Sequence, residues 1–259
     1  MNFSFENKTA LITGAAGAIG KAIAKEFIAA GAKAFVTDLT KDAVEDTVSD
    51  LGEDCLGLAA DVAEEEQVVP VVDAAKEFLG GKIDILVNCA GIIAQDRIED
   101  LTVEAWDRVF AINCRGTFLF CKHVVPVMKQ NGYGKIVNFS SKTGKTGSAL
   151  MCHYSGAKAA IMGMTQSMAY ELAKENITVN CVCPGITDNT GVWKQCSADY
   201  IENLGKTREE VVKQFTAKIP LGRLASINDV VSMVVFLSHQ NSDYMTGQSI
   251  NITGGREMH

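Results

Sequence analysis

Several features that mark special classes of protein are scarce in this sequence. Its 259 residues include only 4 prolines and 7% aromatic residues. No apolar run is long enough to span a bilayer. The N-terminus also lacks the basic segment followed by a long apolar one that marks a secretory signal. We therefore expect no membrane partner and a cytoplasmic location.

The cysteines and histidines form none of the patterns that indicate a disulfide framework or a metal site. None of the eight cysteines belongs to a C-x-x-C motif, and most lie in apolar segments. This pattern is typical of reduced thiols in a reducing compartment. The four histidines lack metal-ligand spacing, which argues against a metal-dependent alcohol dehydrogenase. We expect no metal.

An excess of basic charge is absent as well. The chain has 24 Lys and Arg residues against 31 Asp and Glu residues, for a formal net charge of -7. Such a chain is poorly suited to bind nucleic acid or an anionic membrane surface. Because 47% of the residues are hydrophobic, the chain can bury a sizeable core. These observations favour a globular protein with a small-molecule partner.

Short apolar runs alternate with amphipathic segments along the chain. The expected strands cover residues 8–13, 32–38, 55–60, 83–87, 134–141, 177–183 and 249–252. The expected helices cover residues 21–30, 40–51, 64–79, 102–130, 151–174, 208–218 and 228–237, with a loop at 142–148. This alternation predicts an α/β fold with a doubly wound parallel sheet of about seven strands and helices on both faces. We expect one Rossmann-type domain over residues 1–259, with a substrate lid at about 186–225.

The first expected strand ends in a glycine-rich turn, Thr13-Gly14-Ala15-Ala16-Gly17-Ala18-Ile19-Gly20, which leads into a helix. Glycines let the backbone approach a diphosphate, and the N–H groups at a helix start attract it. Asp38 follows Gly20 by eighteen positions, at the end of the second expected strand. A carboxylate there accepts hydrogen bonds from ribose hydroxyls and repels a 2′-phosphate. The pattern favours NAD over NADP. NADP stays an alternative, because Lys41 lies close enough to tolerate the phosphate.

Tyr154 and Lys158 lie four residues apart in an expected helix, on the same face and one turn apart. An ammonium group beside a phenol favours the phenolate and lowers the phenol's pKa from its ordinary value of roughly 10. Such a phenol can give and take a proton. Ser141 precedes Tyr154 by thirteen residues, at the end of an apolar run. Taken alone, the Tyr and Lys also fit a helix surface.

These segments together resemble the short-chain dehydrogenase/reductase family over essentially the whole chain. The matching elements are the TGAAGAIG turn, Asp38, Asp61-Val62, the NCAG stretch at 88–91, Asn113, Ser141, Tyr154, Lys158 and Pro184-Gly185. Ala18 and Cys89 depart from the family, which usually has glycine and asparagine at these positions. After Pro184-Gly185, the residues Thr187, Asn189 and Thr190 leave open which side chain contacts the nicotinamide amide.

The resemblance implies roles for individual residues. Tyr154 would be the general acid/base, and Lys158 would lower its pKa and hold the nicotinamide ribose. Ser141 would polarise the substrate oxygen, and Asn113 would hold a water on a proton path. Ser140 is a rival for the Ser141 role, but the family spacing favours Ser141. The expected cofactor contacts are Gly14, Ala16, Gly17, Ile19, Gly20, Asp38, Asp61, Val62, Asn88, Ala90, Gly91, Tyr154, Lys158, Pro184, Gly185, Ile186 and Thr187.

The substrate is less well defined. Residues 141–148 and 246–255 look like those of bacterial sugar-alcohol dehydrogenases of the sorbitol-6-phosphate or galactitol type. Polar candidates for the pocket, which also fit solvated loops, are Gln95, Lys142, Lys145, Asp188, Asn189, Lys194 and Gln195, with Trp193 beside them. Lys142 or Lys145 would suit a phosphate. We expect an NAD-dependent oxidoreductase that interconverts a secondary alcohol and a ketone by hydride transfer, with a polyol or sugar-derived substrate.

Three alternatives stay open. The apolar set Ile92, Ile93, Leu150, Met151 and Trp193 fits a hydroxysteroid or bile-acid dehydrogenase. A 3-oxoacyl-carrier-protein reductase would share the chemistry, and a non-catalytic dinucleotide-binding scaffold would share the fold. The family resemblance also implies a homodimer or homotetramer built through residues 102–130 and 151–174. The direction of the reaction and any contact of the C-terminal tail with a neighbouring subunit are left open.

Overall fold

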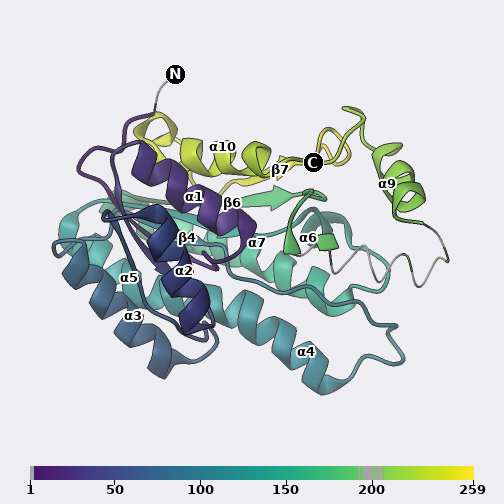
Figure 1. The fold of residues 1–259 in the computed structure, drawn as a ribbon, viewed down its shortest axis with the longest axis horizontal. Coiled ribbons are helices and arrows are strands. Elements are labelled where there is room, and N and C mark those ends of the chain that lie inside the picture. Colours follow the sequence, from purple (N-terminus) through teal and green to yellow (C-terminus); the bar gives the residue numbers. More distant parts are fainter. Residues whose placement is uncertain (1–2, 192, 195–200, 202–204, 206) are drawn as a thin grey trace.

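Seven parallel strands form one sheet in the order β3-β2-β1-β4-β5-β6-β7 (Figure 1). The computed structural model describes residues 3–191, 193–194, 201, 205 and 207–259. The strands are β1 Thr9–Thr13, β2 Lys33–Thr37, β3 Cys55–Gly57, β4 Ile85–Asn88, β5 Gly134–Phe139, β6 Ile177–Pro184 and β7 Ser249–Ile252. The chain winds outward from β1 in one direction and from β4 in the other. This arrangement confirms the predicted doubly wound α/β fold.

Helices cover both faces of the sheet. They are α1 Ala18–Ala29, α2 Lys41–Leu51, α3 Glu65–Phe78, α4 Val103–Phe110, α5 Gly116–Asn131, α6 Lys142–Thr146, α7 Cys152–Leu172, α9 Arg208–Thr216 and α10 Ile227–Ser238. The cores place α1, α2 and α10 on one face and α3, α5 and α7 on the other (Figure 1). Of the helices described, none is both long enough and apolar enough to cross a membrane.

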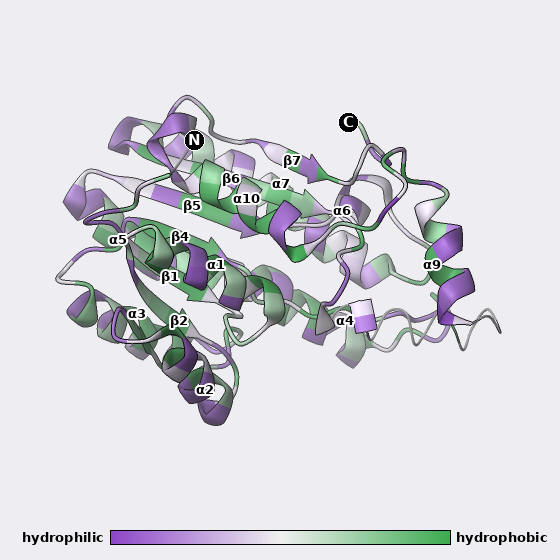
Figure 2. Cartoon of the chain, turned by 45° about the horizontal axis from the view of Figure 1, so that its top comes forward, coloured by the Kyte–Doolittle hydropathy of each residue, from purple (hydrophilic) through white to green (hydrophobic). Residues whose placement is uncertain are grey.

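Successive strand residues enter different cores, as the period of two in a strand requires. In β1, Ala10 and Ile12 pack with Phe27 of α1 and Val234 of α10. Leu11, which lies between them in sequence, belongs to the core formed with α3, α5 and α7. Figure 2 shows hydrophobic residues along the strands and on the helix faces that meet them. Both faces of the sheet are therefore buried, which explains why the strands read as continuous apolar runs.

The expected helix over 102–130 is interrupted. A π-helical turn at Ala111–Arg115 separates α4 from α5, and Asn113 lies at its centre. The Asn113 amide donates to the Val109 carbonyl at 3.0 Å, so its side chain competes for the helix backbone. Such turns are often found at functional sites. The local distortion that the sequence suggests at Asn113 is therefore present.

Three other expectations need correction or remain open. Residues 142–146 form the short helix α6 instead of a loop, because the Ser141 hydroxyl accepts from the Thr143 N–H and caps it. The third strand ends at Gly57 instead of at the expected residue 60, although the Ala60 N–H still donates to the Asp38 carbonyl at 2.9 Å. The expected lid at 186–225 falls partly outside the described residues, so it stays a prediction.

The seven cysteines in the described part of the chain are all free thiols. The eighth, Cys196, lies outside the described residues. Cys181 and Cys183 occupy alternate positions of β6, and both are buried. The described cysteines thus fit the expected reduced state.

A chain of buried amide and hydroxyl groups crosses the middle of the sheet. The Asn88 side chain of β4 donates to the Asn138 carbonyl oxygen of β5 at 2.9 Å. The Asn138 amide in turn donates to the Thr165 hydroxyl of α7 at 3.0 Å. All three residues are buried. Because a buried polar group is costly without a partner, this chain fixes β4, β5 and α7 relative to one another.

We expect the Asn138→Ala substitution to lower the free energy of unfolding by about 2 kcal/mol, because it removes hydrogen bonds of both Asn88 and Thr165. Urea unfolding at one fixed protein concentration measures the change. Asn131→Ala, at the exposed end of α5, is the matched control and should stay within about 0.5 kcal/mol of the wild type. Equal losses in the two variants would contradict the role assigned to Asn138.

Candidate active site

Two adjoining cavities open at the carboxyl ends of the strands. The larger one, of about 900 Å³, lies along the glycine-rich turn and the ends of β2 and β4. The smaller one, of about 170 Å³, lies around Tyr154 and Lys158. Both cavities are lined by Ile19, Cys89, Gly91, Ile92, Ile93 and Thr190, so they form one cleft. The cleft lies between β1 and β4, where the strand order reverses and doubly wound folds bind their ligands.

The glycine-rich turn is packed too tightly for larger residues. Gly14 has φ +66°, and a Cβ built on it would lie 2.7 Å from the Ala90 Cα. A Cβ on Gly20 would collide with the Gly14 carbonyl oxygen. Helix α1 begins after Gly17 with no side-chain cap and no acidic residue in its first turn. Its N–H groups are therefore available to a diphosphate, and the turn fits a dinucleotide.

Asp38 directly follows β2 and lines the larger cavity. Its carboxylate accepts from the Ala16 N–H at 2.9 Å and from the Leu39 N–H at 2.7 Å. These bonds join the carboxylate to the glycine-rich turn and hold it at the cavity wall. Lys41, whose positive charge would offset the negative charge of a 2′-phosphate, is instead paired with Glu45 at 3.5 Å. This cavity is also lined by Arg108 and Arg115, two cations that the sequence analysis did not identify.

Most of the expected cofactor residues line the cleft. The larger cavity is lined by Gly14, Ala16, Gly17, Ile19, Gly20, Asp38, Asp61, Val62, Ala90 and Gly91. The smaller cavity is lined by Tyr154, Lys158, Pro184, Gly185, Ile186 and Thr187. Asn88 lines neither of these cavities, because its side chain points into the sheet toward Asn138 and Cys121. A contact of Asn88 with the cofactor therefore stays a prediction.

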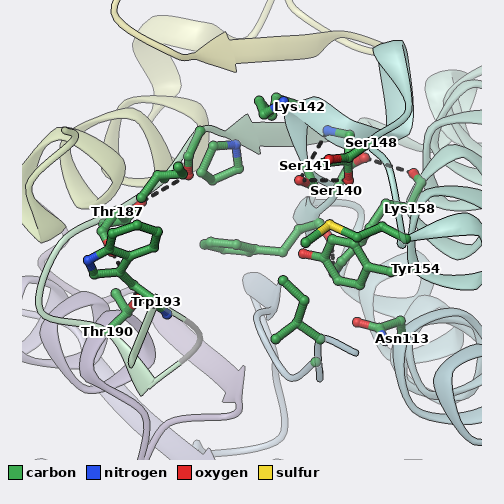
Figure 3. Close-up of a pocket in the computed structure, with 18 of the residues that line it drawn as sticks. Asn113, Ser140, Ser141, Lys142, Ser148, Tyr154, Lys158, Thr187, Thr190 and Trp193 are labelled. Carbon is green, nitrogen blue, oxygen red and sulfur yellow. Dashed lines mark hydrogen bonds between the residues drawn. The ribbon is translucent and has the colours of Figure 1, made fainter. Parts of the chain in front are cut away.

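The four expected catalytic residues meet in the smaller cavity. Figure 3 shows Asn113, Ser141, Tyr154 and Lys158 on one side of it and Thr187, Thr190 and Trp193 on the opposite side. The Lys158 ammonium lies 5.7 Å from the centre of the Tyr154 ring and donates to the Phe139 carbonyl at 2.8 Å. Burial lowers the pKa of Lys158 to about 8. The ammonium is therefore held close to the phenol in a weakly solvated position.

The two adjacent serines have different partners. The Ser140 hydroxyl donates to the Lys158 backbone carbonyl at 2.7 Å, so it connects β5 to α7. The Ser141 oxygen accepts from the Thr143 N–H at 3.2 Å and from the Thr143 hydroxyl at 3.2 Å. A hydroxyl that accepts in this way keeps its own proton to donate. The geometry favours Ser141 over Ser140 as the hydroxyl that serves the cavity.

Asn113 is held with its carbonyl oxygen unsatisfied. Its amide nitrogen donates to the Ile92 and Val109 carbonyls, each at 3.0 Å. Its Oδ1 atom is buried and has no partner among the described residues. A Cβ built on Gly91 would lie 2.6 Å from this oxygen and 3.3 Å from the Lys158 ammonium. Gly91 thus keeps a narrow space open beside both groups.

The expected substrate residues divide into two groups. Lys142 and Trp193 line the smaller cavity, whereas Gln95, Lys145 and Asn189 do not. The Lys145 ammonium donates to the Ser249 carbonyl at 2.8 Å, and this bond holds it against β7. Asn189 is exposed, so Thr187 and Thr190 are the hydroxyl side chains on this segment that reach the cavity.

The other candidates follow the same division. Asp188 forms an ion pair with Arg208 at 3.9 Å, and Gln195 lies outside the described residues. Of the apolar set, Leu150 is absent from the lining, whereas Ile92, Ile93, Met151 and Trp193 are part of it. Further lining residues that the sequence analysis did not identify include Ser148, Phe215 and Arg256. No sequence motif indicates these residues, because Phe215 and Arg256 reach the cavity only through the tertiary fold.

Comparison with known proteins agrees with this geometry. The family model for short chain dehydrogenases matches residues 8–201. Galactitol 2-dehydrogenase from Agrobacterium fabrum is 38% identical over 253 residues, covering 97% of this chain and 98% of that protein. A 3-oxoacyl-[acyl-carrier-protein] reductase from Aquifex aeolicus is 33% identical over 261 residues, covering 98% of this chain and 99% of that protein.

A solved structure extends the similarity to three dimensions. The crystal structure of NAD⁺-bound xylitol dehydrogenase superposes with a TM-score of 0.92 and 32% sequence identity, covering 97% of this chain and 99% of that one. The chain therefore belongs to the short-chain dehydrogenase/reductase family and is an oxidoreductase that acts on CH–OH groups.

Proposed function

We propose that this protein, as a single dinucleotide-binding catalytic domain, is an NAD-dependent dehydrogenase that interconverts a secondary alcohol and a ketone on a polyol or sugar-derived substrate. The observation that carries the proposal is the meeting of Asn113, Ser141, Tyr154 and Lys158 in one cavity that opens into the glycine-lined cleft. A homodimer or homotetramer and a cytoplasmic location remain predictions.

The chemistry of the cavity follows from the positions of its groups. A bound nicotinamide dinucleotide supplies the hydride donor or acceptor. In alcohol oxidation, Ser141 donates a hydrogen bond to the substrate oxygen, and the Tyr154 oxygen takes the hydroxyl proton. The Lys158 ammonium favours the phenolate form of Tyr154, because an opposite charge nearby stabilises an anion. In the reverse direction Tyr154 returns the proton to the carbonyl oxygen.

Asn113 provides the beginning of a proton path. Its buried and unpartnered Oδ1 lies beside the same narrow space as the Lys158 ammonium. A water held there would accept from Lys158 and donate to Asn113, which satisfies the orphaned oxygen. We assign Asn113 the role of positioning this water, through which Lys158 exchanges protons with solvent.

The cofactor preference rests on Asp38. Its carboxylate is fixed at the wall of the larger cavity, where it would accept from the ribose hydroxyls of NAD and repel the 2′-phosphate of NADP. The NAD⁺-bound neighbour supports the same choice. Arg108 and Arg115 add positive charge to that cavity, but Arg115 is already paired with Glu64 at 3.7 Å.

The polyol substrate is supported by the relatives that act on sugar alcohols and by the hydroxyl groups of Ser141, Ser148, Thr187 and Thr190 in the cavity wall. A hydroxysteroid is the second candidate. It is favoured by the apolar part of the same wall, to which Ile92, Ile93, Met151, Trp193 and Phe215 contribute.

A substrate panel separates these candidates. We expect xylitol or galactitol with NAD to give at least about tenfold higher kcat/KM than hydroxysteroids, 3-oxoacyl thioesters or the same polyols with NADP. Asp38→Ser should narrow the difference between NAD and NADP, because it removes the repulsion of the 2′-phosphate. Steady-state absorbance of the reduced cofactor measures each pair. Tenfold preference for NADP, or for a steroid, in the wild type would refute the proposal.

We expect Tyr154→Phe to lower kcat by about 10³-fold, within the range of general acid–base catalysis, while NADH still binds. The matched control is Tyr170→Phe, because Tyr170 lies on the same helix with 90% of its surface exposed. Turnover and NADH fluorescence titration measure the two quantities. Full turnover in the Tyr154 variant would exclude the assigned role.

The burial of Lys158 predicts a pH-dependent stability. Below pH 8 the folded protein carries the full penalty of a buried ammonium. Between about pH 8 and the ordinary pKa of roughly 10.4, the folded state releases this proton while the unfolded state keeps it. Stability from this group therefore rises with pH across that window. The penalty is lost once both states are neutral.

We expect the stability of the wild type relative to Lys158→Met to increase by about 2 kcal/mol between pH 7 and 9.5. Urea unfolding at both pH values measures the difference. The same comparison with the exposed Lys174→Met is the control and should give no trend. A flat difference for Lys158 would mean that its ammonium is not desolvated in the folded chain.

A further inference from the structure

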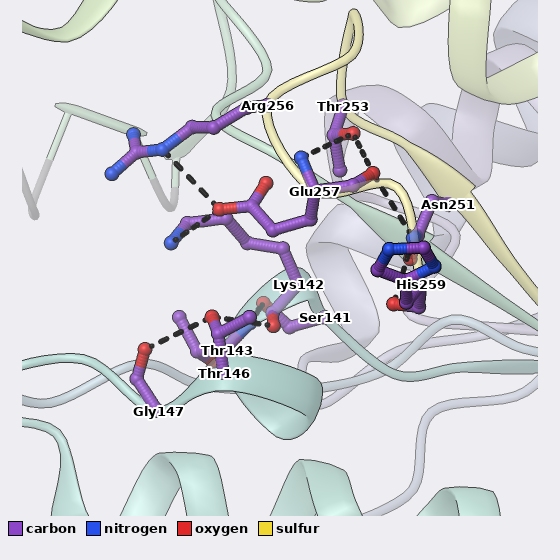
Figure 4. Close-up of polar contacts among 10 residues, drawn as sticks. All are labelled: Ser141, Lys142, Thr143, Thr146, Gly147, Asn251, Thr253, Arg256, Glu257 and His259. Carbon is purple, nitrogen blue, oxygen red and sulfur yellow. Dashed lines mark hydrogen bonds and ion pairs between the residues drawn. The ribbon is translucent and has the colours of Figure 1, made fainter. Parts of the chain in front are cut away.

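Three charged residues from distant parts of the chain meet at the smaller cavity. Lys142 lies at the start of α6, and Arg256 and Glu257 follow β7 near the C-terminus. The Glu257 carboxylate pairs with the Lys142 ammonium at 3.4 Å and with the Arg256 guanidinium at 3.3 Å (Figure 4). Lys142 and Arg256 both line the cavity that holds Tyr154. We call these three residues the charged cluster.

The charged cluster carries more positive than negative charge. Two cations share one carboxylate, although the side chains of Lys142, Arg256 and Glu257 are only 12%, 19% and 10% exposed. A guanidinium has five N–H donors, and a buried one is costly unless most of them are satisfied. Among the described residues, the Arg256 guanidinium makes one ion pair and lies 5.7 Å from the Phe215 ring. It therefore has unused capacity for an acceptor.

Lys142 shows the same imbalance. Burial lowers its pKa, and the neighbouring positive charges of Arg256 and Lys218 lower it further, against the opposing effect of Glu257. The charged form of Lys142 is thus less stable here than in water, even with Glu257 beside it. An additional anion in the cavity would relieve the repulsion between the two cations.

The segment that carries Arg256 and Glu257 is held in place by β7 and the turn after it. The Asn251 amide donates to the Glu257 backbone carbonyl at 3.1 Å and to the His259 carbonyl at 3.2 Å. The Thr253 hydroxyl donates to the same Glu257 carbonyl at 3.0 Å. These bonds fold the tail back onto its own chain, so Arg256 is positioned before any ligand arrives.

We propose that Arg256 and Lys142 bind an anionic group of the substrate, a phosphate ester or a carboxylate, and that the natural substrate is a hydroxylated carbon chain bearing such a group. This inference rests on the proposed function. Lys142 directly follows Ser141, which contacts the reacting oxygen in the proposed function. The anionic group is therefore held on the same side of the cavity as that oxygen. Glu257 holds the two cations apart and in place, and it competes with the substrate anion for both.

Three five-carbon substrates test the proposal on the wild-type protein with NAD: xylitol, xylitol 5-phosphate and xylonate. We expect kcat/KM for at least one of the two anionic compounds to exceed that for xylitol by about tenfold, as charge-assisted hydrogen bonds allow. The better of the two identifies the phosphate ester or the carboxylate as the group recognised. Equal or lower values for both anionic compounds would overturn the proposal.

Substitutions locate the effect. Arg256→Gln and Lys142→Gln should each lower the ratio of anionic to neutral kcat/KM by about tenfold, mainly through KM. Arg208→Gln makes the same change in charge at an exposed residue outside the cavity and should leave the ratio unchanged. Glu257→Gln should raise the ratio, because it removes the competing carboxylate. If Glu257→Gln and Arg256→Gln lower the ratio alike, the cluster is only structural and the proposal is wrong.

Binding measurements distinguish a failure of this inference from a failure of the proposed function. If none of the three compounds is turned over, the polyol proposal fails, and calorimetry on the NAD-bound protein decides the further inference. Tighter binding of xylitol 5-phosphate or xylonate than of xylitol, lost in Arg256→Gln, supports the anion site. Equal binding of charged and neutral compounds excludes it.

Discussion

The buried ammonium of Lys158 is the group on which the site depends. It is removed from water, and its hydrogen bond to the Phe139 carbonyl at 2.8 Å offsets part of that cost. The Ser140 hydroxyl holds the backbone carbonyl of the same lysine at 2.7 Å. The end of β5 and the first turns of α7 are therefore joined twice. Because Tyr154 precedes Lys158 by one helical turn, these bonds also fix the position of the phenol in the cavity.

The fold places this pair beside a dinucleotide cleft through packing constraints that act far from the chemistry. Gly14 allows the turn after β1 to approach Ala90 after β4, and Gly20 allows α1 to pack against the Gly14 carbonyl, so a side chain at either position would collide with backbone. The chain of hydrogen bonds from Asn88 through Asn138 to Thr165 then ties β4, β5 and α7 into one unit. The cleft and the smaller cavity are thus set by the same strands, so a ligand that spans both meets the phenol in a fixed orientation.

The sequence was sufficient to predict the features that depend on residues close together in the chain. The strands and most helices follow from their periodicity, and Asp38, Ser141, Tyr154 and Lys158 follow from spacing within segments that the backbone keeps rigid. Helix α6 was missed because its one turn depends on a cap from Ser141 and has no periodicity. The hydrogen bond of the Asn88 side chain to Asn138 could not be predicted, because the two residues lie on neighbouring strands and are fifty positions apart in sequence. Arg256 was missed because more than a hundred residues separate it from Lys142 in sequence, and only the return of the chain after β7 brings them together.

The fixed charges in the two cavities of the cleft differ in sign. Asp38 places a carboxylate at the wall of the larger cavity, whereas Lys142 and Arg256 place excess positive charge at the wall of the smaller one. The net charge of -7 acts on ligands only weakly at a distance, because salt screens charges beyond about 8–10 Å. Inside the cleft, burial removes that screening, so these few fixed groups outweigh the charge of the whole surface. Under the proposed function, recognition is therefore decided at the two ends of the cleft, and the residues between them, Ser141, Tyr154 and Lys158, are left to handle protons.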